Sequence, residues 1–341
     1  MDPLADFLDG PRARGAFLLR QVMTAPWSVD VRDGAPLTLG VVRRGGAWFV
    51  PRTGEPVRLG TGDVVVVRGP EHYRIADSPT RLPQVVIHPG QRCTTVDGHD
   101  VSTTMTHGVR TWGNDPDGDD ELLVGTYETQ GEVGRLLTDA LPRTFRVPAD
   151  DDVTSAAVAL LAAELDRDAV GQSSVLDRLL DLLLVHVVRR WLTDLDPASG
   201  GASEGANGET GEHASAAGPT TTRGWIGAQS DPVAGPAVRL LHEHPARAWT
   251  VASLAHEVGA SRALLARRFH ERVGQPPMAY LTTWRLALAA DRLTTGSETV
   301  AAVARDLGWS SPFTFSAAFK RRYGLSPQHY RTHATGAAAH A

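Results

Sequence analysis

A helical unit that occurs twice near the C-terminus is the feature that most constrains the fold. The two copies span residues 251–280 and 300–330, at an offset of 49 residues up to the glycine and of 50 after it, because the turn of the second copy has one more residue. In each copy, an apolar stripe with helical spacing ends at a glycine, Gly259 or Gly308. A serine suited to capping a new helix follows, and a second apolar stripe completes the unit. This order predicts a helix-turn-helix, used twice in tandem.

The outward face of the second helix in each unit predicts double-stranded DNA as a partner. Leu265 and Phe269 point inward in the first unit, so the cations lie on the exposed side. Exposed cations suit phosphates and can grip guanine in the major groove. Ordinary helical hairpins with solvated arginines are the alternative. We expect DNA contacts from Arg262, Ala263, Ala266, Arg267 and His270, and from Ser311, Pro312, Phe313, Thr314, Ala317, Lys320 and Arg321.

Several short runs in this region carry a family resemblance. They are Leu254-Ala255, Leu265-Ala266-Arg267-Arg268-Phe269, Gly308-Trp309-Ser310-Ser311-Pro312-Phe313-Thr314-Phe315-Ser316 and Gly324-Leu325-Ser326-Pro327. With these residues, the stretch from Pro232 to Arg331 resembles the DNA-binding domain of AraC/XylS-type transcription regulators. The resemblance implies two helix-turn-helix units, joined by a long helix, that enter adjacent turns of the major groove.

The resemblance also implies which positions read bases. They are Ala263, Ala266 and Arg267 in the first unit, and Pro312, Phe313, Thr314 and Ala317 in the second. Several are apolar here, where many relatives have Gln, Trp or Arg. We therefore expect direct readout to rest mainly on Arg267, with Arg262 as a second candidate. Contact with thymine methyl groups and DNA shape would supply the rest. RNA polymerase and a second copy of the chain, in a homodimer, are the further partners expected.

Charge is distributed unevenly along the chain. The net charge of the chain is −5, yet the part from residue 236 onward contains 13 basic and only six acidic residues. A basic end on an acidic body is the electrostatic footprint of a DNA-binding domain with an attached sensor. Residues 278–293 contain neither Gly nor Pro and predict the joining helix, about 24 Å long at 1.5 Å per residue.

The N-terminal half predicts a small β-barrel, because short β runs alternate with Gly and Pro turns from residue 27 to 128. Residues 62–67, followed by Pro70 and His72, resemble the second motif of cupin barrels. Residues 39–49 lack the two histidines and the glutamate of a metal-binding cupin, so we expect no metal and no cofactor. The barrel mouth is a candidate pocket for a small-molecule effector. Its candidate lining residues are Trp48, His72 and Tyr127, for each of which a core or rim role is the alternative.

These features favour a sequence-specific DNA-binding transcription regulator, controlled by the effector, over an enzyme. A cupin-type enzyme fused to a DNA-binding domain is the alternative, and the missing ligands count against it. A repair methyltransferase would need an acceptor thiol, but Cys93, the sole cysteine, has the setting of a buried strand residue. The single cysteine and the lack of a signal peptide or membrane-length apolar run predict a cytoplasmic protein without a membrane partner.

The expected fold class is α+β, in five segments. A segment at residues 196–223 is rich in Gly, Ser, Ala and Thr, which predicts a flexible linker. Such a linker would transmit little rigid movement between the segments on either side of it. The segments are a cupin-like barrel (1–148), a helical pair that packs on the barrel or joins two chains (149–195), the flexible linker (196–223), an all-α domain with two helix-turn-helix units (224–333) and a disordered tail (334–341).

Overall fold

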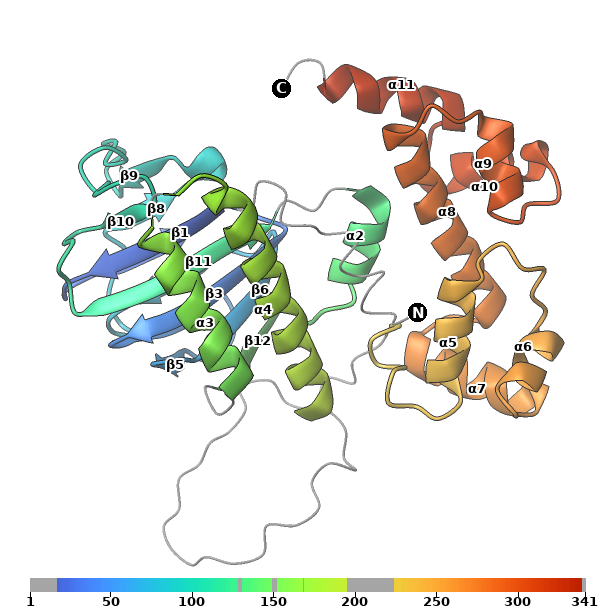
Figure 1. Cartoon of the computed structure of the whole chain (residues 1–341), viewed down its shortest axis with the longest axis horizontal. Coiled ribbons are helices and arrows are strands. Elements are labelled where there is room, and N and C mark those ends of the chain that lie inside the picture. The colour runs from blue at the N-terminus through green and yellow to red at the C-terminus, as the bar shows by residue number, and fades with distance from the viewer. Residues whose placement is uncertain (1–16, 128–130, 149–151, 168, 195–223, 339–341) are drawn as a thin grey trace, which may run out of the picture. The chain divides into compact units, whose positions relative to one another are not determined.

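The computed structural model describes residues 17–127, 131–148, 152–167, 169–194 and 224–338. They form an α+β structure with two compact units, one rich in strands and one helical (Figure 1). The predicted fold class is therefore confirmed. The predicted linker, 196–223, lies outside the described residues.

The β-rich unit contains two six-stranded sheets. Strand pairing in the first follows the order β10-β1-β11-β3-β6-β12, and in the second β5-β4-β7-β2-β8-β9. The first sheet comprises β1 (Phe17–Met23), β3 (Leu37–Arg44), β6 (Val64–Arg68), β10 (Thr111–Gly113), β11 (Asp120–Tyr127) and β12 (Thr144–Val147). The second comprises β2 (Ser28–Val31), β4 (Gly46–Pro51), β5 (Val57–Gly60), β7 (Tyr73–Ala76), β8 (Val85–Ile87) and β9 (Cys93–Thr95), with a 3-10 turn, η1 (Pro89–Gln91), before β9.

The core lies between the two sheets, since one buried cluster draws side chains from both. Alternation along the strands decides which residues enter it. On β6, Val65 and Val67 belong to this cluster, whereas the equally buried Val64 and Val66 point to the other face. Cys93 is buried in the cluster, as expected, and burial raises the pKa of its thiol to about 11.

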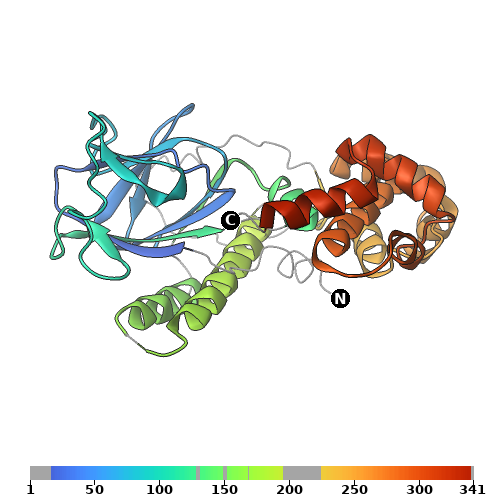
Figure 2. The same cartoon turned by 90° about the horizontal axis from the view of Figure 1, so that it is seen from above.

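Two helices, α3 (Asp152–Leu165) and α4 (Gln172–Asp194), run side by side and cover the outer face of the first sheet (Figures 1 and 2). The Tyr127 hydroxyl donates to the Leu180 carbonyl at 2.8 Å. Gly125 leaves room for α4, because a Cβ there would lie 2.7 Å from the Leu180 side chain. The pair predicted to span 149–195 is thus present, and most of its leucine stripe is buried within the chain.

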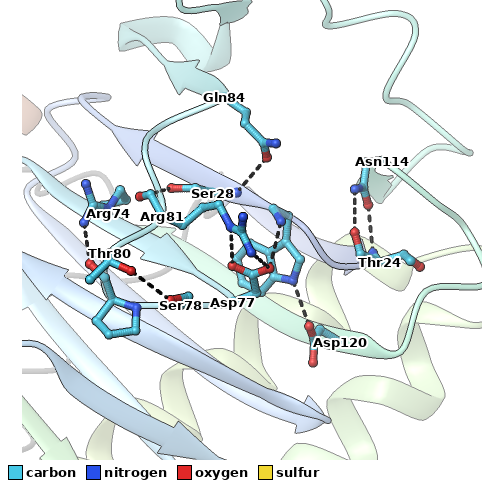
Figure 3. Close-up of polar contacts among 12 residues, drawn as sticks. Thr24, Ser28, Arg74, Asp77, Ser78, Thr80, Arg81, Gln84, Asn114 and Asp120 are labelled. Atoms are coloured by element: carbon cyan, nitrogen blue, oxygen red, sulfur yellow. Dashed lines mark hydrogen bonds and ion pairs between the residues drawn. The ribbon is translucent and has the colours of Figure 1, made fainter.

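The loop between β7 and β8 is fixed by polar contacts (Figure 3). Asp77 accepts from the Trp27 backbone and forms an ion pair with Arg81, at 2.9 Å between Arg81 Nε and Asp77 Oδ1. The Trp27 indole donates to Asp120 at 2.7 Å, which joins the loop to the start of β11. These contacts hold the loop against the residue that precedes β2, whose indole is itself buried in the core.

The helical unit begins, in chain order, with a segment that the sequence did not predict. Helix α2 (Gly131–Thr138) lies between β11 and β12 in sequence but packs on α8. The other helices of the unit are α5 (Ala234–Glu243), α6 (Val251–Glu257), α7 (Arg262–Val273), α8 (Pro277–Thr295), α9 (Val300–Asp306), α10 (Pro312–Tyr323) and α11 (Pro327–Ala338).

Two parts of the sequence interpretation need correction. Residues 131–148 were placed within the barrel segment, yet only β12 joins it, by pairing with β6, whereas α2 packs on α8. The tail was expected to be disordered from residue 334, yet α11 continues to Ala338. Helix α2 has only eight residues, too few to be stable alone, so its structure depends on tertiary packing.

His242 connects α5 to α8 inside the helical unit. Its Nε2 lies 2.6 Å from the Tyr280 hydroxyl, and its ring stacks on Trp284 with centroids 4.0 Å apart. Burial lowers the pKa of His242 to about 3. The folded unit therefore contains a neutral imidazole that the unfolded chain protonates more readily.

We expect the stability of the helical unit to fall as the pH drops below about 6.5, the ordinary pKa of histidine. Between the folded and unfolded pKa values the unfolded chain binds the extra proton, so stability is full above this window and decreases within it. From pH 6.5 to 5 the loss is about 2 kcal/mol. Urea unfolding against pH would measure it. His242→Gln should remove this slope, whereas His256→Gln, at an exposed histidine, should retain it; equal slopes in both variants would contradict the assignment.

Candidate nucleic-acid interface

Helix α7 is the second helix of the first helix-turn-helix unit, and its ends are fixed by local signals. Ser261 caps it by accepting from the Leu264 backbone at 3.2 Å, and Gly274 ends it with a left-handed conformation at φ +86°. Leu265, Phe269 and Val273 are buried in one stripe. The predicted contact residues Arg262, Ala263, Ala266, Arg267 and His270 are all exposed. The helix therefore presents one continuous exposed face.

The inner side of α7 is anchored by a buried carboxylate. Asp231 Oδ1 accepts from the backbones of Val233 and Ala234, both at 2.9 Å, and so caps α5. Its Oδ2 lies 2.6 Å from Arg268 Nη2 and 3.3 Å from Arg272 Nε, both on α7. One buried side chain thus caps α5 and fixes the angle of α7 against it.

Helix α10 presents the equivalent face of the second unit. Ser311 caps it by accepting from the Thr314 backbone, and Pro312 occupies its first turn. Phe313 is 85% exposed, although Phe315 and Phe319 of the same helix are fully buried. An exposed aromatic side chain in the first turn is available for apolar contact with a groove. The other predicted contact residues, Thr314, Ala317, Lys320 and Arg321, lie on the same helix, and all four are exposed.

The backbone of the second helix-turn-helix unit touches the loop between α5 and α6, directly before the first unit. A Cβ at Gly308, in the turn between α9 and α10, would lie 2.2 Å from the Ala246 carbonyl oxygen. Arg285 of α8 reinforces this contact with hydrogen bonds to three carbonyl groups, those of Pro245 (2.6 Å), Arg247 (2.8 Å) and Gly308 (3.3 Å). The separation of α7 and α10 is therefore fixed by close packing as well as by α8.

The structure does not bring the three predicted effector-binding residues together. On β4, Ala47 and Phe49 belong to the core, so the alternating Trp48 points to the opposite face. His72 is exposed before β7, and Tyr127 is buried against α4. The register of each strand decides to which side of its sheet a side chain points. The local spacing of residues in the sequence could not predict that side.

Two buried donors do lie next to each other inside the β-rich unit. Gln21 and Trp112 are register partners on β1 and β10. Gln21 Nε2 and Trp112 Nε1 are buried without a hydrogen-bond partner in the described structure. Trp112 belongs to the core, and Gln21 lies on the same face of β1 as the inward-facing Leu19 and Met23. Buried donors nearly always have an acceptor, which makes these two side chains candidates for a polar contact with a bound molecule.

Sequence reasoning missed Asp231 and Arg285, which position the interface. Asp231 carried a readable signal, an Asp-Pro pair directly before an apolar helix. Its partners on α7 and the carbonyl partners of Arg285 are mostly about 40 residues away in sequence, and helical periodicity cannot reveal such contacts. Among the described residues, no group of three or more His, Cys, Asp or Glu side chains is arranged to hold a metal ion, and no helix is long and apolar enough to span a membrane.

Comparison with known proteins agrees with this two-part organisation. Residues 2–193 match a family profile described as Cupin, and residues 254–333 match one described as Helix-turn-helix domain. A protein of Streptomyces lividans described as a putative AraC-like transcription regulator is 32% identical, over 98% of this chain and 99% of its own length. One of Streptomyces antibioticus with the same description is also 32% identical, with the same coverage. AlkR of Acinetobacter baylyi, an HTH-type transcriptional regulator, is 25% identical over 97% of this chain and 99% of its own length.

Proposed function

Because this chain belongs to the AraC-like transcription regulators, we propose that it reads two adjacent DNA half-sites and that a small effector in its β-rich unit controls this binding. The observation that carries the proposal is the pair of exposed helix faces on α7 and α10, held together where Gly308 meets Ala246. Two rigidly joined helices suit two successive major-groove turns, about 34 Å apart.

Selection of bound sequences from a random DNA pool tests this reading with the full chain. The expected result is a motif with two half-sites about one helical turn apart. Binding without an enriched motif would mean that the helical unit grips only phosphates and would overturn specific recognition.

Sedimentation of the full chain with the selected duplex would give the number of copies bound. A second copy is supported by the exposed apolar residues Val153, Leu160, Val175 and Leu182 of α3 and α4.

Arg267→Ala should weaken binding to the selected site by about 1–3 kcal/mol and relax base preference at one position. The Arg267 side chain is 65% exposed, and its ion pair with Glu271 is long, at 3.8 Å, so it is free to reach guanine. Titration of single-base variants of the site would measure both effects. A uniform loss across all variants would instead assign Arg267 to a phosphate.

Lys320→Ala should weaken binding to all sequences alike, because we assign Lys320 to a phosphate. Lys320 lies in the last turn of α10, beyond the predicted base-reading positions. The slope of log affinity against log salt should fall by about one. Titration of the selected and scrambled duplexes at several salt concentrations would show it, and an unchanged slope would contradict the assignment.

Effector control is supported by the unpartnered donors of Gln21 and Trp112. Both donate and neither is cationic, so they suit an uncharged, largely apolar molecule with an oxygen acceptor. Thermal unfolding of the full chain against a panel of small ketones, esters and alcohols would test this, since a bound ligand raises the unfolding temperature. Gln21→Leu should abolish such a shift. Retention of the full shift in this variant would place the ligand elsewhere.

A further inference from the structure

Helix α2 belongs to one unit by packing and to the other by chain connection. It packs on α8 of the helical unit. At its two ends, only residues 128–130 separate it from β11 and residues 139–143 from β12, and both strands belong to the first sheet of the β-rich unit. The β-rich unit is therefore joined to the helical unit through α2, independently of residues 195–223.

The N-terminus of α2 is capped by a residue far along the chain. The Asp291 carboxylate of α8 accepts from the Glu132 backbone at 2.5 Å and from the Val133 backbone at 3.0 Å. Gly131 permits this approach, because its φ is +89° and a Cβ would lie 2.7 Å from both Asp291 oxygens. An eight-residue helix is unstable alone. The helical form of α2 therefore depends on its contact with α8.

A side chain of α2 interacts with α11, which in turn packs on α10. Glu132 is buried and pairs with Arg135 at 2.6 Å. Burial raises the pKa of Tyr330 on α11, and the nearby Glu132 carboxylate raises it further. The Tyr330 ring packs on Tyr323 of α10 at 5.3 Å and on the buried Phe319 at 5.3 Å. A continuous set of contacts thus runs from α2 to the core side of α10.

From these contacts we propose that α2 is a coupling element, which docks on α8 through Asp291 and links the state of strands β11 and β12 to the position of α10. The inference rests on the proposed function, because this coupling can regulate DNA binding only if the helical unit binds DNA. A helix that forms only when docked has two discrete states, which is what a switch requires. A change that displaces β11 or β12 would release the Asp291 cap. By reciprocity, DNA binding to α10 would change the dynamics of the two strands.

Hydrogen exchange of the full chain without DNA tests the docking. Asp291→Ala removes both capping bonds and should speed exchange at residues 131–138 about tenfold. Asp306→Ala removes an equal charge from an exposed ion pair of the same unit and should leave these amides unchanged. Gly131→Ala should reproduce the Asp291→Ala effect. Gly171→Ala, at a glycine with φ +83° and nothing within 4 Å, is its control. Unchanged exchange at 131–138 in both test variants would overturn the docking.

The same measurement with the selected DNA duplex tests the coupling. In the wild-type chain, DNA should slow exchange at α7 and α10 and also change exchange at β11 and β12. The change at the strands should vanish in Asp291→Ala. Protection of α7 and α10 with no response at the strands would overturn the coupling while leaving DNA binding intact. No protection at α7 or α10 would refute DNA binding itself, and the DNA-free comparison would then decide the docking alone.

Discussion

Gly308→Ala should both destabilise the helical unit and lower its affinity for DNA more than about tenfold. The added Cβ would lie 2.2 Å from the Ala246 carbonyl oxygen and 2.8 Å from its carbonyl carbon. Because the added atom would meet backbone rather than a flexible side chain, the turn between α9 and α10 must move away from the loop between α5 and α6. We expect a loss of about 3 kcal/mol in the free energy of unfolding, which adds overpacking to the strain of φ +76°.

Gly259→Ala is the matched control, because Gly259 occupies the same position in the first unit. Its φ is +66°, and nothing lies within 4 Å of the position that an added Cβ would take. This variant should therefore cost only the conformational strain, about 1 kcal/mol, and leave the spacing of α7 and α10 unchanged. Urea unfolding and DNA titration of both variants would separate the two effects. Equal losses of stability and of DNA affinity in the two variants would show that the contact between Gly308 and Ala246 does not set the spacing of α7 and α10.

Asp231→Ala should cost about 3 kcal/mol in the free energy of unfolding. The substitution uncaps α5 and leaves Arg268 and Arg272 without their shared carboxylate, whose side chain is fully buried. Asp231→Asn retains an acceptor for the cap but loses the charge, so its loss should be intermediate. Because α7 loses its anchor, DNA affinity should fall even at temperatures where the variant is folded.

The control for this prediction is Asp306→Ala. Asp306 also pairs with two arginines, Arg292 and Arg305, but its side chain is 41% exposed. Exposed ion pairs contribute little, so this variant should change stability by less than about 1 kcal/mol. Thermal unfolding of both variants in the same buffer would make the comparison. A similar loss in both would mean that charge balance, rather than the buried anchor, sets the stability.

The sequence predicted the features that local pattern controls. The tandem helices, their serine caps and the glycines that end them appear where periodicity placed them. The features that it missed depend on contacts between distant residues. Asp291 caps a helix 159 positions earlier in the chain, and Trp48 points away from the core because of the register of β4 against β7. Local spacing carries no information about either.

The backbone contact between Ala246 and Gly308 has a consequence for the promoters that such a protein can serve. A base substitution in one half-site removes a few contacts, whereas a one-base insertion between half-sites shifts the second by about 3.4 Å and turns it by about 35° around the duplex. A domain whose halves are packed backbone to backbone cannot follow that displacement. We therefore expect natural binding sites of this regulator to vary in sequence from promoter to promoter but to keep the same number of base pairs between their halves.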